Sequence, residues 1–131
     1  MLATTFGRDG DYALLILRLF IGGVFIGHGA LKLFGGLPGF ELFLMQHGVP
    51  LARVMAPVVA GIEFLGGVAF ILGLGTRLAA LLLICVMIVA IVTVTLPQGF
   101  AGGYDLNLAL LGGLTALFLV GPGKFAYGGD L

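Results

Sequence analysis

Residues 77–96 read RLAALLLICVMIVAIVTVTL, and no residue after Arg77 in this stretch carries a charge. A bilayer core about 30 Å thick is crossed by a helix of roughly 20 apolar residues, so the stretch predicts a transmembrane helix. Three further stretches have the same character, at about residues 12–34, 53–74 and 105–120. Backbone groups in lipid are satisfied only within helices or closed barrels. We therefore expect an all-α membrane protein, a four-helix bundle that forms a single domain over residues 1–131.

The composition leads to the same class. The chain is 60% hydrophobic and 9% charged, and its mean hydropathy is +1.23. Soluble domains are about 45–50% apolar and about 25% charged, so a soluble enzyme and a disordered tail are excluded. The formal net charge is zero, which gives nucleic acid no bulk attraction to the chain. The single cysteine, Cys85, excludes an internal disulfide and a cysteine-based metal cage. The main partner predicted is membrane lipid.

The connection between the first two spans, residues 35–52, is long enough to hold structure of its own. Its middle, residues 40–47, reads FELFLMQH and predicts a short helix that Gly48 ends. This helix is too short to span a bilayer, so we expect it to lie at the membrane surface.

Four spans place both chain ends on one side of the membrane. That side carries Arg8, Arg77 and Lys124, against Lys32 and Arg53 on the other. Because positive residues are enriched in cytoplasmic loops, the balance favours cytoplasmic termini.

Glycine is abundant, with 24 residues in the chain, and many lie inside the predicted spans. Small residues let helix backbones approach closely in lipid. We assign eight of them to helix packing: Gly22, Gly23, Gly27, Gly29, Gly66, Gly67, Gly112 and Gly113. A second interpretation is that the glycine faces leave room for a flat ligand such as a quinone ring.

Four ionisable residues lie within or near the first two spans, namely Arg18, His28, Lys32 and Glu63. A charge at the bilayer centre costs about 2.5–3.5 kcal/mol on insertion scales, so such residues are retained where they are paired or used. Helical periodicity puts Arg18 and Lys32 on one stripe of the first helix, and antiparallel packing would set Glu63 between them. One interpretation is a structural ion pair at the centre of the bundle. The other is a proton or quinone site, with His28 near its rim.

A metal centre is not predicted. A haem held by two histidines needs a second axial ligand, and the other histidine, His47, lies in the first loop. The sequence shows no His, Cys and carboxylate cluster with the spacing of zinc ligands. We expect no intrinsic cofactor. A quinone is the small molecule that the ionisable residues in the spans could bind.

Taken in order, these features resemble the DoxX family of small four-helix membrane proteins. The first span carries R-x3-G-x2-F-x3-G-x2-K from Arg18 to Lys32, followed by Phe34-Gly35. The later residues that carry the resemblance are Gly48, Val49, Pro50, Glu63, Gly66, Gly67, Gly73, Thr76, Arg77, Gly121, Gly123 and Lys124. One departure is that the family often has Ser and then Asp after the last glycines, where this chain has Ala126 and Gly128, with Asp130 two residues later.

The resemblance implies membrane redox chemistry. DoxX-like proteins include a subunit of a thiosulfate-to-quinone oxidoreductase, and others act with a superoxide dismutase and a sulfurtransferase in a thiol-redox membrane complex. By analogy we expect a subunit of a redox complex in a bacterial or archaeal cytoplasmic membrane, joined to other protein subunits or to copies of itself. The alternative is a non-catalytic structural or assembly subunit of a larger membrane complex.

Overall fold

The computed structural model describes residues 7–128, and every regular element in that part of the chain is helical. In chain order the elements are α2 (Gly7–Leu33), α3 (Leu37–Gln46), α4 (Ala52–Leu72), α5 (Thr76–Ala90), η1 (Ile91–Thr95), η2 (Phe100–Tyr104) and α6 (Asp105–Val120). Asp130, at which the sequence departs from the family pattern, lies outside the described residues.

Four helical segments are long and apolar enough to cross a membrane: Gly7–Leu33, Ala52–Leu72, Thr76–Thr95 and Phe100–Val120. The predicted fold class, an all-α bundle of four spans with a short helix between the first two, is confirmed. The first span begins earlier than the sequence suggested because its polar head is helical. The fourth begins at Phe100 because a wide turn, η2, leads into α6.

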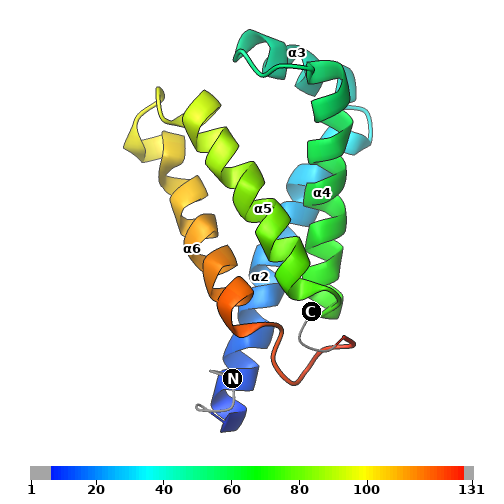
Figure 1. Ribbon diagram of the computed structural model, residues 1–131, viewed down its shortest axis with the longest axis vertical. Coiled ribbons are helices and arrows are strands. Elements are labelled where there is room, and N and C mark those ends of the chain that lie inside the picture. The colour runs from blue at the N-terminus through cyan, green and yellow to red at the C-terminus, as the bar shows by residue number, and fades with distance from the viewer. Residues whose placement is uncertain (1–6, 129–131) are drawn as a thin grey trace.

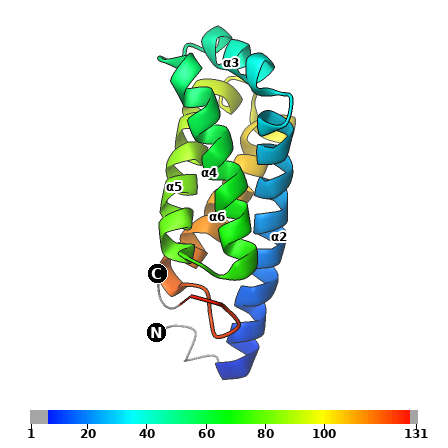
Figure 2. The same ribbon diagram turned by 90° about the vertical axis from the view of Figure 1, so that its right-hand side faces the viewer.

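The helices form two antiparallel pairs, with α2 against α4 and α5 against α6 (Figure 2). The short helix α3 lies across the end of α4 at one end of the bundle, and the start of α2 lies at the other end (Figure 1). The main core runs through all four long helices and includes Phe25, Phe70, Leu83 and Leu114. Large apolar residues such as Phe20 cover the outer faces, as expected of a surface in contact with lipid.

The α2–α4 contact depends on glycine. A Cβ atom on Gly67 would stand 2.6 Å from the carbonyl oxygen of Gly22, and one on Gly22 would stand 2.8 Å from the carbonyl oxygen of Gly67. A Cβ atom on Gly29 would likewise meet the backbone of Phe64. These distances are too short for any side chain, so the two backbones approach as closely as glycine permits.

The other predicted packing glycines divide into two groups. A Cβ on Gly66 would stand 2.9 Å from Leu83, and one on Gly113 would meet Ile21. By contrast, nothing lies within 4 Å of a Cβ built on Gly23, Gly27 or Gly112. The helix-packing role predicted for these three glycines is therefore wrong, because no neighbouring helix within residues 7–128 packs closely against them. The spacing of Gly23 and Gly27 resembles a packing motif, but both lie on an exposed face of α2.

Residues 121–128 return from α6 across the end of the bundle where α2 begins. The Tyr127 N–H donates to the Leu72 carbonyl at 3.0 Å, and the Gly128 N–H donates to the Gly73 carbonyl at 2.9 Å. The Lys124 N–H donates to the Asp11 carboxylate at 3.0 Å. This C-terminal segment thus joins α2 to the end of α4 and closes one end of the bundle.

Candidate functional site

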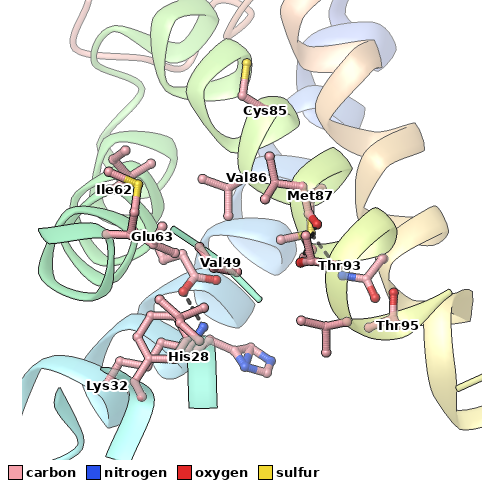
Figure 3. A pocket seen from close by; sticks show the side chains of 18 of the residues that line it. His28, Lys32, Val49, Ile62, Glu63, Cys85, Val86, Met87, Thr93 and Thr95 are labelled. Atoms are coloured by element: carbon pink, nitrogen blue, oxygen red, sulfur yellow. Dashed lines mark hydrogen bonds and ion pairs between the residues drawn. The ribbon is translucent and has the colours of Figure 1, made fainter. Parts of the chain in front are cut away.

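A cavity of about 710 Å³ lies toward the α3 end of the bundle, and every helix described above contributes to its wall (Figure 3). Most of the wall is apolar, formed by residues such as Phe25, Ile62 and Val86. Val58 on α4 and Leu82 on α5 line the cavity and are exposed. The cavity is therefore open rather than enclosed, and its long walls are helices apolar enough to span a membrane.

The cavity holds one ion pair, formed by Lys32 of α2 and Glu63 of α4 (Figure 3). The Glu63 side chain is 4% exposed and the Lys32 side chain is 26% exposed. Lys32 Nζ also lies 4.7 Å from the centroid of the Phe40 ring, which adds a cation–π contact from α3. The charge pair is thus held by three helices, with its basic partner nearer the outside.

His28 lines the same cavity, one helical turn before Lys32 on α2. It is exposed, and Figure 3 shows its imidazole beside the Lys32–Glu63 pair. Three of the four site residues predicted from sequence are therefore brought together. A histidine and a carboxylate at one wall provide groups that can accept and donate protons.

Arg18, the fourth predicted site residue, is in a different place. It lies 14 residues before Lys32 on α2, which is about 21 Å along a helix that rises 1.5 Å per residue. Its guanidinium is fully buried and donates to the Phe125 carbonyl of the C-terminal segment. It does not line the cavity, so the expected Arg18–Glu63 centre is corrected to a Lys32–Glu63 pair.

The stripe that suggested this pairing does form a buried face, since Arg18, Gly22, Phe25 and Gly29 are all buried on α2. The stripe expected to face it on the second helix is buried on α4 too, and it consists of Glu63, Gly66, Gly67 and Phe70. The sequence prediction had the wrong register of α4 along α2. Glu63 lies level with Lys32, at the end of the stripe, and not midway between Arg18 and Lys32.

Sequence reasoning missed the wall opposite the ion pair. At its end α5 widens into the π-helix η1, where the Leu96 N–H donates to the Ile91 carbonyl five residues back at 2.9 Å. This brings Thr93 and Thr95 to the cavity, and Asn107 of α6 lines it as well. The sequence did offer one signal, which is the pair of hydroxyl side chains at Thr93 and Thr95 in an otherwise apolar span. The π-helix that carries them is a feature frequent at functional sites.

Comparison with known proteins decides the family. The DoxX family model matches residues 13–96, from α2 through η1. The chain belongs to the DoxX family. The putative oxidoreductase CatD of Bacillus subtilis (strain 168) is 38% identical over 117 residues, which cover 89% of this chain and 84% of CatD.

A second relative is the uncharacterized membrane protein Rv3486 of Mycobacterium tuberculosis (strain ATCC 25618 / H37Rv). It is 32% identical over 135 aligned residues, which cover 90% of this chain and 80% of that protein. No solved structure matches the chain. The family, the four apolar helices and this relative identify an integral membrane protein.

Proposed function

We propose that this DoxX protein is the membrane subunit of a quinone-linked redox complex, and that the cavity holds the quinone headgroup beside Lys32 and Glu63. The observation that carries the proposal is a charge pair with a buried carboxylate, which lines an open and mostly apolar cavity among membrane-spanning helices. Small-molecule sites have volumes of roughly 300–1,000 Å³ and apolar walls with a few polar groups. The cavity has this size and character, and a quinone can enter it from the bilayer.

The name of CatD, a putative oxidoreductase, supports the redox assignment. Reduction of a quinone held here to a quinol would need two electrons, supplied by a redox protein outside this chain, and one proton for each ring oxygen, taken up from the membrane surface. Lys32 donates a hydrogen bond to one quinone oxygen, and Glu63 supplies or accepts the proton at that oxygen. His28, nearer the outside, passes protons between Glu63 and the membrane surface.

A second candidate is a structural subunit in which the ion pair only fastens α2 to α4. The direct Lys32–Glu63 contact favours this reading, because each charge already has its partner. The two candidates differ in what loss of the Glu63 charge should do. A proton site would lose quinone turnover with the complex intact, whereas a structural pair would lose assembly first.

The test is to purify the protein from its own membranes in mild detergent, identify retained proteins and quinones by mass spectrometry, and measure quinone turnover. The wild-type chain, Glu63→Gln and Glu41→Gln are compared. Glu41 is the one other glutamate of the chain and lies on α3 away from the cavity wall. We expect retained quinone in the wild type and in Glu41→Gln, and loss of turnover without loss of partners in Glu63→Gln. A wild-type preparation that binds no quinone overturns the proposal.

A further inference from the structure

The wall opposite the ion pair contains a polar atom with no partner. The Thr95 hydroxyl is buried and makes no hydrogen bond in the structure of residues 7–128. Leaving a buried hydroxyl unsatisfied is unfavourable. Thr95 lines the cavity, so the cavity is where a partner for this hydroxyl can be placed.

Two other threonines satisfy their hydroxyls within their own helices, in contrast to Thr95. The Thr93 hydroxyl donates to the Val89 carbonyl at 2.7 Å, and the Thr115 hydroxyl donates to the Leu111 carbonyl at 2.8 Å. Both use the carbonyl four residues back, which is the usual solution in an apolar helix. The carbonyl four residues before Thr95 belongs to Ile91, and in η1 it accepts the Leu96 N–H at 2.9 Å. The Thr95 hydroxyl makes no bond to it and remains available to the cavity.

Asn107 adds a second weakly used group on the same side. Its side-chain nitrogen donates to the Met87 sulfur at 3.5 Å, and a thioether is a weak acceptor. Asn107 comes from α6 and Thr95 from η1, and both line the cavity. In Figure 3, Thr93 and Thr95 lie across the cavity from Lys32 and Glu63. The cavity therefore has hydrogen-bonding groups at two ends and apolar walls between them.

We infer that Thr95 and Asn107 form the second hydrogen-bonding end of the cavity, and that its ligand is a flat ring with oxygen atoms on opposite edges. This inference rests on the proposed function and names two further residues that select the ligand. The Asn107 amide and the Thr95 hydroxyl donate to one carbonyl of a para-quinone, while the Lys32 end binds the other. A single-headed amphiphile, such as a fatty acid, would leave one end of the cavity unpaired.

The test uses direct binding of a short-tailed ubiquinone to the purified full chain in detergent. A monophenol with the same tail, which offers one ring oxygen, serves as the second probe. The near-isosteric variants Thr95→Val and Asn107→Leu are compared with Thr115→Val, whose hydroxyl is satisfied within α6 and lies outside the cavity. Each lost hydrogen bond should weaken ubiquinone binding roughly three- to tenfold.

We expect Thr95→Val and Asn107→Leu each to weaken ubiquinone and to leave the monophenol, held at the Lys32 end, unchanged. Thr115→Val should bind both probes as the wild type does. Thr95→Val should also unfold at a temperature no lower than the wild type, because it removes an unsatisfied hydroxyl, which separates a ligand contact from a structural role. If both variants bind ubiquinone as tightly as the wild type, this inference is overturned while the proposed function stands. If the wild type binds neither probe, the proposed function itself fails.

Discussion

Two basic residues of α2, Arg18 and Lys32, lie toward opposite ends of the bundle and have different surroundings. Arg18 lies under the C-terminal segment, where its partner is a backbone carbonyl. Lys32 lies at a cavity, where its partner is the carboxylate of Glu63. At the closed end, Arg18 fastens the C-terminal segment to α2. At the cavity end, the Lys32–Glu63 pair lines a space that a ligand can enter. Of these two charges, only Lys32 lies where a ligand in the cavity would meet it.

The largest effect is expected at the cavity end, from breaking the ion pair. Lys32→Met should destabilise the bundle by about 3–5 kcal/mol, because it leaves Glu63 buried without its partner. Glu63→Gln should cost less, because Lys32 is partly exposed and its long side chain can reach outward. The double variant Lys32→Met/Glu63→Gln should recover most of the loss. The measurement is unfolding in mixed detergent micelles for all four proteins.

A double variant as unstable as the sum of the two single changes would mean that the two charges do not interact in the folded protein. Lys32 would then not differ from Arg18 by having a charged partner. Glu41→Gln again serves as the control, and it should leave the unfolding midpoint unchanged.

A smaller effect is expected at the closed end. Arg18→Met removes the hydrogen bond to the Phe125 carbonyl, but it also removes a buried guanidinium whose Nε and Nη1 have no partner within the described part of the chain. These two changes oppose each other, so global stability should shift by no more than about 1 kcal/mol. The C-terminal segment should loosen locally instead.

Hydrogen exchange measures this loosening. The N–H groups of Tyr127 and Gly128, which bond to α4 and the residue after it, should exchange about tenfold faster in Arg18→Met, since about 1.4 kcal/mol corresponds to tenfold. Arg8→Met is the matched control, because Arg8 is exposed on the same helix. Equal exchange in the two variants would contradict a fastening role for Arg18.

Sequence reasoning predicted the spans and the buried stripes because lipid leaves few alternatives to apolar helices, and a buried face needs helical periodicity. It found the residues of the ion pair but joined Glu63 to the wrong end of the stripe. The register of α2 against α4 is set by contacts such as Gly22 on Gly67, and a periodic pattern does not encode that register. Gly23 and Gly27 lie off the buried stripe that carries Gly22 and Gly29, so their exposure follows from helical periodicity and not from the register.

The π-helix in the opposite wall of the cavity could not be predicted from the sequence, although two threonines in an apolar span marked its place. A π-helix is a change of hydrogen-bond partner by one residue, and the letters of residues 91–95 are equally compatible with a continued α-helix. The Thr95 hydroxyl, which has no partner within residues 7–128, lies in this π-helix. Its neighbour Thr93 has the same side chain and satisfies it locally.

The smallest expected effect is measured at the cavity end in the wild-type protein, as protection of a cysteine from alkylation. Cys85 is the single cysteine of the chain, is exposed, and lines the cavity. A ligand in the cavity should shield it from a small membrane-permeant maleimide. The alkylation rate should fall by the factor 1 + [L]/Kd, which is about fourfold when short-tailed ubiquinone is present at three times its Kd.

A cysteine moved to the closed end, in the variant Cys85→Ser/Ile16→Cys, is the control, because Ile16 is exposed far from the cavity wall. Protection at Cys85 alone would place the ligand at the end with the ion pair, whereas equal slowing at both positions would mean that the quinone only changes the detergent or the reagent.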